Sequence, residues 1–340
     1  MEVAHNTSEA VSLDARRCLD SEVRSDWVLD KPCGAVQCFG STILEIQPGV
    51  ILCCWCMGKN GSCPEPGVWY ARYEAGKWST PALFKSQLEQ PHWNPVLFRD
   101  DRFGVFLFFR VGATRFTWQT YWMRSEDGRI WSEPEPLVPN DRIGRGPSKN
   151  APIILSSGSW LAPGSTELGG WGCFADRSDD GGHSWSHTNY FRIDHTVIRG
   201  RGTTQPAFWE SRPGRVHAVM QTTTGWIGRS DSVDGGRSWS SVQLTRLPNP
   251  NTPIDALRLP EGKIVVALNH QHDTAEPTMP LSLAVSDNDG ASWRTVTAVG
   301  TLQEGSCTHP ALTRSKEGLV LSCTVGGVRV RCLQIPTGVL

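Results

Sequence analysis

The chain has 340 residues, of which 39% are hydrophobic and 20% charged, so it can build an apolar core and is not disordered by composition. Its 33 basic and 34 acidic residues nearly cancel, and they form no basic block. Neutralising a phosphate backbone needs clustered Lys and Arg, so no nucleic-acid partner is expected.

The first 25 residues predict a loose tail ahead of the folded part. They are polar and acidic, without the basic start and apolar stretch of a signal peptide. The longest apolar runs, GVILCCWCM from Gly49 and GVFLFF from Gly104, have the length of a strand and are far too short for a membrane span. We therefore expect an intracellular, cytoplasmic protein with no membrane partner.

The cysteines do not form a metal-binding pattern. Six of the eleven fall between Cys33 and Cys63, and Cys53 to Cys56 is formally a C-x-x-C. That pair lies inside an apolar run, and no second pair of Cys or His completes a zinc site. We expect buried free thiols that pack as small hydrophobic side chains, and no metal.

From residue 26 onward the sequence predicts a succession of short strands. The runs are β-branched or aromatic and are bounded by Gly, Pro, Asn or Asp, which is typical of strands and tight turns. Examples are VILCCWCM, RVHAVMQT, KIVVALNH and LVLSCTV, which start at Val50, Arg215, Lys263 and Leu319. We find no amphipathic helix of a dozen residues, so the fold class is all-β.

A repeat with a fixed period organises these strands. Trp131, Trp185, Trp239 and Trp293 follow one another at intervals of 54 residues, and Trp78 lies another 53 residues upstream. A period of this size indicates a solenoid, a propeller or an array. Because each period holds about four short strands, it predicts one blade of a β-propeller.

The starts of the periods count the blades. Each opens with one or two polar residues, usually followed by Pro and then an apolar strand; the openings lie at Pro32, His92, Lys149, Thr204, Pro253 and Thr308. The sequence therefore predicts a single six-bladed β-propeller over residues 26–340. The sixth period is about one strand short, and we expect DWVLD at Asp26 to supply that strand, so that the ring closes without exposed sheet edges.

The turns that carry the repeated Trp resemble the Asp-box, S-x-D-x-G-x-S-W, of sialidases and the wider BNR-repeat families. SDDGGHSWS at Ser178 and SVDGGRSWS at Ser232 match in full, SDNDGASWR at Ser286 has Asn288 for the Asp, and SEDGRIWS at Ser125 is one residue short. With the blade openings, the resemblance covers roughly residues 30 to 335. It implies that the boxes join the outer strands of a blade, away from the active site.

Elementary chemistry agrees with a structural role for the boxes. The short Asp or Asn side chain accepts hydrogen bonds from N–H groups of its own turn, Gly adopts a positive φ, and Trp packs between neighbouring sheets. We therefore do not place catalysis on the box carboxylates.

Chemistry is expected instead where the innermost strands begin, because these openings converge at one mouth of the central channel. Buried polar groups must be paired or used, so a ring of them predicts a pocket for a small molecule or a glycan, with a structural, water-filled channel as the alternative. The candidate catalytic residues are Asp255, His309, His92 and Glu167. The candidate substrate-binding residues are Trp93, Asn94, Lys149, Asn150, Gln205, Arg110, Arg145, Gln221, Asn269 and His270.

The match to sialidases is incomplete. Sialidases resemble one another in an Arg-Ile-Pro motif, an arginine triad that grips the substrate carboxylate, and a Tyr nucleophile paired with Glu. No Arg-Ile-Pro occurs here, none of the four Tyr opens a blade, and His309 stands where a late-blade Tyr is expected. The resemblance thus favours a divergent member of the superfamily.

The first functional hypothesis is a hydrolase or lyase acting on an acidic or deoxy sugar. Hydrolysis usually uses two carboxyl groups, for which Asp255 and Glu167 are the candidates. A lyase needs a base, His92 or His309, and a cation such as Lys149 to neutralise a uronate.

Two other classes remain open. One is an intracellular biosynthetic enzyme (a cyclase, isomerase or pericyclase) acting on a small non-sugar metabolite, for which an aromatic interior with Trp55, Trp93, Trp118 and Trp209 is suited. The other is a non-catalytic propeller that binds a glycan or a protein, because a fold does not determine a function. No phosphate-binding or dinucleotide-binding glycine motif is visible, so no cofactor is expected.

Overall fold

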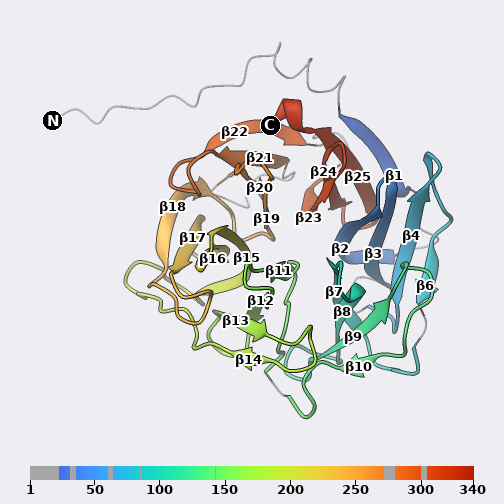
Figure 1. Cartoon of the computed structure of the whole chain (residues 1–340), viewed down its shortest axis with the longest axis horizontal. Coiled ribbons are helices and arrows are strands. Elements are labelled where there is room, and N and C mark those ends of the chain that lie inside the picture. Colours follow the sequence, from blue (N-terminus) through green and yellow to red (C-terminus); the bar gives the residue numbers. More distant parts are fainter. Residues whose placement is uncertain are drawn as a thin grey trace.

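The computed structural model describes residues 23–30, 36–59, 64–84, 86–141, 143–271, 280–299 and 305–340. They form six antiparallel sheets arranged in a ring around a central axis (Figure 1). The predicted all-β, six-bladed propeller is confirmed. Most of the expected N-terminal tail lies outside the described residues.

Each blade runs outward from an inner strand. Blade 1 holds β2 (Val36–Gln47), β3 (Val50–Lys59), β4 (Val68–Glu74), β5 (Lys77–Trp78) and β6 (Ala82–Phe84). Blade 2 holds β7 (His92–Asp100), β8 (Gly104–Val111), β9 (Gln119–Ser125) and β10 (Glu135–Pro136). Blade 3 holds β11 (Ile153–Ile154), β12 (Trp160–Thr166), β13 (Gly172–Ser178) and β14 (Ser186–His187).

The second half of the ring follows the same plan. Blade 4 holds β15 (Thr203–Arg212), β16 (Arg215–Thr222), β17 (Trp226–Ser232) and β18 (Gln243–Pro248). Blade 5 holds β19 (Asp255–Arg258), β20 (Ile264–Asn269), β21 (Leu281–Ser286) and β22 (Arg294–Val299). Blade 6 holds β23 (Cys307–Ser315), β24 (Gly318–Val325), β25 (Arg329–Pro336) and β1 (Arg24–Leu29), and a short 3-10 helix, η2 (Thr337–Val339), follows β25.

The N-terminal strand closes the ring as predicted. β1 pairs antiparallel with β25 on the outside of blade 6, with Asp26 opposite Cys332 (Figure 1). The first and last segments of the chain thereby share one sheet, and blade 6 gains the fourth strand that its own period lacks.

The Asp-box turns lie between the third and fourth strands of blades 2 to 5, as the resemblance implied. In the box of blade 4, Asp234 accepts hydrogen bonds from the N–H and Oγ of Ser238, and Ser232 Oγ accepts one from the N–H of Gly236, at 2.9 Å. Partial burial raises the pKa of Asp234, but these hydrogen bonds outweigh it and lower the pKa to about 2. The carboxylate of Asp234 is therefore used for hydrogen bonds within its own turn.

The box tryptophans pack between and within blades. The ring of Trp185 in blade 3 meets Phe108 of blade 2 at right angles, with the ring centres 6.5 Å apart, and lies 6.3 Å from Trp160. Trp239 stacks on Phe208 at 5.1 Å. These contacts make each turn a structural joint, which is the role expected for it.

The cysteines agree only in part with the prediction of free thiols. Six of them are free and buried among the described residues, and burial raises the pKa of Cys38 and Cys173 to about 12, so they stay protonated. Cys307 and Cys323, however, form a disulfide between β23 and β24. Spacing along the chain does not reveal this pair, because strand pairing brings the two cysteines together.

Two further features concern only the described part of the chain. It contains no group of three or more His, Cys, Asp or Glu placed to hold a metal ion. None of its helical segments has the length and apolar character needed to cross a bilayer.

Candidate functional site

The inner strands share an unusual backbone feature near their starts. Asn94, Gln205 and His309 have φ values of 47°, 49° and 54°, and each precedes a Pro at a β-bulge. Non-glycine residues seldom adopt this left-handed conformation, which costs about 1–3 kcal/mol and is concentrated at functional sites. Three polar side chains are thus held in one strained conformation at the same end of the channel, which we call the entry mouth.

The first blade shows the same feature with glycine. β2 has a bulge at Gly40, whose φ is 55° and which lies 54 residues before Asn94. The opening predicted at Pro32 lies outside the described residues, and the structural equivalent of the other openings is Gly40. Blade 1 therefore contributes no side chain at this position.

Many polar residues of the openings fasten one blade to the next. Asn94 donates from Nδ2 to the carbonyl of Ser148 at 2.9 Å, linking blades 2 and 3, and Asn150 donates to the carbonyl of Pro206 at 3.0 Å, linking blades 3 and 4. These side chains satisfy backbone carbonyl groups of the neighbouring blade. Part of the predicted ring is therefore structural.

Asp255 also forms a hydrogen bond that links one blade to the next. Its carboxylate accepts hydrogen bonds from the N–H of Ala256 at 2.8 Å and of Leu312, in blade 6, at 2.7 Å. Thr42 does the same in blade 1, where its hydroxyl accepts from the N–H of Leu97 in blade 2 at 3.0 Å. Burial raises the pKa of Asp255, although Lys149 and the two N–H groups oppose the shift.

Lys149 crosses the channel. It comes from blade 3, and its Nζ donates to the carbonyl of Ile254 in blade 5 at 3.0 Å and to the carbonyl of Pro310 in blade 6. Burial lowers the pKa of Lys149 to about 8, and the Asp255 carboxylate opposes the shift. An ammonium group has three donors, so one N–H of Lys149 is left for a ligand.

His309 lies beside this ammonium group. Burial and the charge of Lys149 lower the pKa of His309 to about 4, so the imidazole is neutral at pH 7. Its Nδ1 contacts Thr308 Oγ1 at 3.1 Å, while Nε2 has no hydrogen-bond partner among the described residues. A neutral imidazole with one free nitrogen next to a cation can accept a proton.

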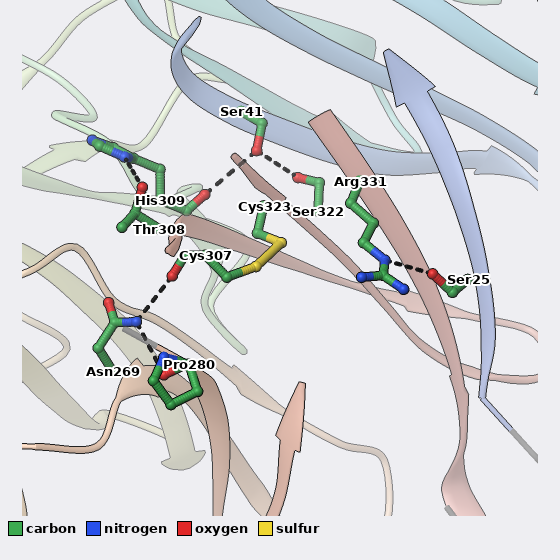
Figure 2. The surroundings of a disulfide bond; sticks show 10 residues. All are labelled: Ser25, Ser41, Asn269, Pro280, Cys307, Thr308, His309, Ser322, Cys323 and Arg331. Carbon is green, nitrogen blue, oxygen red and sulfur yellow. Dashed lines mark hydrogen bonds between the residues drawn. A yellow bond between two sulfur atoms is a disulfide. The ribbon is translucent and has the colours of Figure 1, made fainter. Parts of the chain in front are cut away.

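The strand that carries His309 is fixed from several sides (Figure 2). The disulfide ties Cys307 to β24, and Asn269 donates from Nδ2 to the carbonyl of Cys307 at 2.9 Å and to that of Pro280 at 3.1 Å. Ser41 Oγ lies 3.4 Å from the carbonyl oxygen of His309. Asn269, predicted as a substrate-binding residue, thus supports the backbone beneath the candidate base.

His92 does not join this cluster. Its Nδ1 bonds the carbonyl of Gln90 at 2.8 Å, its Nε2 bonds Ser86 at 3.2 Å, and its ring stacks on Phe109. It is buried, and burial lowers its pKa. Both ring nitrogens are occupied within its own blade and its lead-in segment, so the structure offers His92 no proton to exchange with a channel ligand.

Glu167 lies apart from Asp255. Its carboxylate pairs with Arg115 at 3.0 Å, and it lines a space of about 10 Å³ together with Arg110 and Trp118. That space holds about one water molecule, and Asp255 is not part of its wall. The two carboxylates proposed for hydrolysis therefore share no described cavity.

The predicted arginines are bound internally. Arg110 is buried, donates to the carbonyl of Gly144 at 3.0 Å and lies over the ring of Trp118; burial lowers its pKa to about 10, against the pull of Glu167. Arg145 bonds the fully buried Asp176, with 2.7 Å between Nε and Oδ1. Neither resembles an arginine held free for a substrate carboxylate.

The remaining predicted residues are divided between the entry mouth and its support. Gln221 is buried and donates to Gln205 at 2.8 Å, which orients the Gln205 amide. Trp93 is half-buried, donates to the carbonyl of Gly112, and packs against Phe39 and Trp118, so it forms an aromatic wall beside Asn94. His270 is exposed just beyond β20.

Six antiparallel blades, four of them with Asp-box turns, define a sialidase-like propeller. Residues 49–321 match the family model described as the BNR repeat-like domain, so the chain belongs to that family. No curated protein sequence is significantly similar to it.

Solved structures show the same fold at low identity. The Hadza microbial sialidase Hz136 aligns with a TM-score of 0.74 and 15% identity, over 89% of this chain and 66% of that one. A protein of unknown function from Dyadobacter fermentans DSM 18053 aligns with a TM-score of 0.73 and 15% identity, over 92% of this chain and 99% of that one. Trypanosoma rangeli sialidase has a TM-score of 0.68 and 12% identity, over 92% and 59%. This chain thus spans less than two thirds of the length of either sialidase.

Proposed function

We propose that the chain is a carbohydrate-active enzyme that works at the entry mouth on an acidic sugar, and that it acts as a lyase. The observation that carries this proposal is the pair formed by His309, with its free Nε2, and Lys149, with its free N–H. Sialidase-like neighbours support a sugar substrate, and the cation at the mouth fits a substrate carboxylate.

Other mechanisms of the superfamily find less support in this chain. Tyr70 and Tyr73 lie on β4, Tyr121 lies on β9, and Tyr190 follows β14, so no Tyr lies on an inner strand. The pair of carboxylates needed for hydrolysis is lacking, because Asp255 is bound to backbone N–H groups and Glu167 to Arg115. The groups that remain for catalysis are a base, His309, and a cation, Lys149.

The chemistry follows from these two groups. Lys149 binds the carboxylate of a uronate and stabilises the negative charge that develops when the adjacent carbon loses its proton. His309 takes that proton, the bond from the neighbouring ring carbon to the glycosidic oxygen breaks, and the leaving oxygen is protonated by the imidazolium or by water. The products are an unsaturated uronate and a free alcohol, and no oxidant or cofactor is consumed.

Substrate binding also strengthens the base. The charge of Lys149 is one cause of the low pKa of His309. A bound carboxylate offsets that charge, so the pKa of His309 rises toward its ordinary value in the complex, where a base is needed. Trp93 offers an aromatic face on which a pyranose ring can pack.

The test is a panel of uronate-containing oligosaccharides, sialosides and small phenolic metabolites, followed by the ultraviolet absorbance of a new conjugated double bond and by reducing ends. His309→Gln is the main variant, because Gln205 already occupies the same strained position in blade 4. We expect kcat to fall about 10²- to 10⁴-fold in His309→Gln, as for loss of a general base. The matched control, His195→Gln, changes an exposed histidine and leaves kcat unchanged.

Three results would overturn the proposal. They are wild-type kcat in His309→Gln, turnover of sialosides with reducing ends but no double bond, and activity confined to the small metabolites. Binding of a glycan without any turnover would favour the non-catalytic propeller.

A further inference from the structure

A cavity lies at the opposite end of the channel. It has a volume of about 520 Å³, within the range of small-molecule sites. Its wall starts at Ala151, Asp255 and Leu312, each one or two positions beyond Lys149, Ile254 and Pro310. The Lys149 side chain therefore separates this cavity from the entry mouth. We call its open end, where the inner strands finish, the far mouth.

The wall of the cavity combines apolar and polar surface in nearly equal parts. Leu44, Leu97, Leu257 and Ile154 contribute to it from four different blades. Ile154 is 42% exposed, which is unusual for a large aliphatic side chain and leaves an apolar surface open at the far mouth.

Charged side chains recur in register near the ends of the inner strands. Arg99, Glu210 and Arg314 each lie five positions after the strained residue of their blade, and Arg258 ends β19. All four line the cavity. This ring of charge at the far mouth parallels the polar ring at the entry mouth.

Two of these charges are already engaged. Glu210 accepts hydrogen bonds from the N–H of Ser156 at 2.6 Å and the N–H of Gly214 at 2.8 Å, and Arg99 pairs with Asp101 at 2.7 Å.

Arg258 and Arg314 are left with an excess of positive charge. Arg314 Nε donates to the carbonyl of Arg258 at 2.8 Å, which brings the two residues side by side. Burial and the charge of Arg258 lower the pKa of Arg314, and Glu261 offsets only part of the effect. Arg258 Nε is buried without a hydrogen-bond partner, which is costly unless a ligand supplies an acceptor.

We propose that this cavity binds a small organic carboxylate with an apolar body, such as a medium-chain fatty acid. The carboxylate accepts from Arg258 and Arg314, which provide several donors in a planar fork, and the chain lies along Leu44, Leu257 and Ile154. The site is separate from the proposed lyase site, so either can fail without the other.

The test is isothermal titration calorimetry of the whole chain with decanoate below its micelle concentration. Decanol serves as the uncharged analogue and acetate as the charge without the apolar body. We expect one saturable site for decanoate, with each analogue binding about tenfold more weakly or worse. Raising the salt concentration should weaken decanoate binding.

Variants locate the site. Arg314→Gln and Arg258→Gln should each weaken decanoate binding about tenfold or more, because a charge-assisted hydrogen bond is lost. Ile154→Glu, at an exposed position, should abolish it by placing a negative charge at the far mouth. Arg246→Gln, which removes an exposed arginine of the outer strand β18, is the matched control and should bind as the wild type does.

Circular dichroism confirms that each variant is folded. No saturable binding to the wild type, or equal affinity in Arg314→Gln and Ile154→Glu, overturns the proposal. Binding that survives these changes but is lost in Lys149→Met places the carboxylate at the entry mouth instead, which also overturns it.

Discussion

The strongest stability prediction concerns the coupling between Lys149 and Asp255. The two charges interact through the channel without a direct hydrogen bond, since Lys149 donates to the carbonyls of Ile254 and Pro310, and Asp255 accepts from backbone N–H groups. Each residue offsets the cost of burying the other's charge. Replacing both should therefore cost less than the sum of the single replacements.

The magnitudes follow from the bonds that each change removes. Asp255→Ala leaves the N–H of Leu312 without its acceptor and the Lys149 charge without its counter-charge, and we expect a loss of about 3–5 kcal/mol, as for a broken buried pair. Lys149→Met leaves two carbonyls without their donor, for about 2–4 kcal/mol. In the double variant the electrostatic interaction is lost only once. The destabilisation of the double variant is therefore smaller than the sum of the two single destabilisations by about 1–3 kcal/mol.

The assay is urea unfolding followed by tryptophan fluorescence, at pH 7 where Lys149 is mostly charged. Thr42→Val provides a matched control, because Thr42 holds the N–H of Leu97 as Asp255 holds that of Leu312, but without a charge. Its effect should add to that of Lys149→Met. If the double variant of Asp255 and Lys149 is destabilised by the sum of the two single changes, within about 0.5 kcal/mol, the coupling is refuted.

Three other predictions follow from the same contacts. The pH profile of kcat/KM should be bell-shaped, rising as His309 loses its proton above about pH 4 and falling as Lys149 loses its proton above about pH 8; a flat profile between pH 3 and 10 would contradict both assignments. Asp234→Asn should keep the box intact, as Asn288 does in blade 5. Because the pKa of Asp234 is about 2, below its unfolded value, the wild type should lose this stabilisation as the pH falls from about 4 to 2 while Asp234→Asn does not, a difference that acid unfolding curves would show. Cys323→Ser should lower the free energy of unfolding by about 2–3 kcal/mol more under oxidising conditions than in the presence of a reductant, because only the oxidised wild type has the disulfide to lose.

The architecture could be predicted from the sequence because its signals are local and repeated. Each box carries its Ser, Asp, Gly and Trp within one turn, and that turn makes its own hydrogen bonds in the structure. Ring closure by Asp26 could be inferred because the sixth period visibly lacked a strand. The disulfide between Cys307 and Cys323 could not, since it depends on the register in which β23 pairs with β24.

The site was harder to predict because orientation depends on the bulge. His92 and His309 both open a blade, so the two look alike in the sequence. A signal was present: His309 directly precedes a Pro, as Asn94 and Gln205 do, whereas His92 stands two positions before Asn94. Aligning the residues before Pro would have placed His309, and not His92, at the strained position facing the entry mouth.

The shared site formed by the arginines of the far mouth could not be predicted from the sequence for a different reason. Arg99, Arg258 and Arg314 each look like a solvated residue at the end of a strand. Only the ring arrangement brings Arg258 and Arg314 together at the cavity. A count of five positions beyond Asn94, Gln205 and His309 reaches Arg99, Glu210 and Arg314, but no such count reaches Arg258.

The hydrogen bonds bear on both interpretations of the polar ring, a ligand pocket and a structural channel. Asn94, Asn150 and Asp255 use their side chains to join neighbouring blades, as a structural ring requires. Once these bonds are assigned, His309 Nε2 and one N–H of Lys149 remain without protein partners among the described residues. The same ring therefore joins neighbouring blades and leaves His309 and Lys149 as the two groups on which the proposed reaction depends.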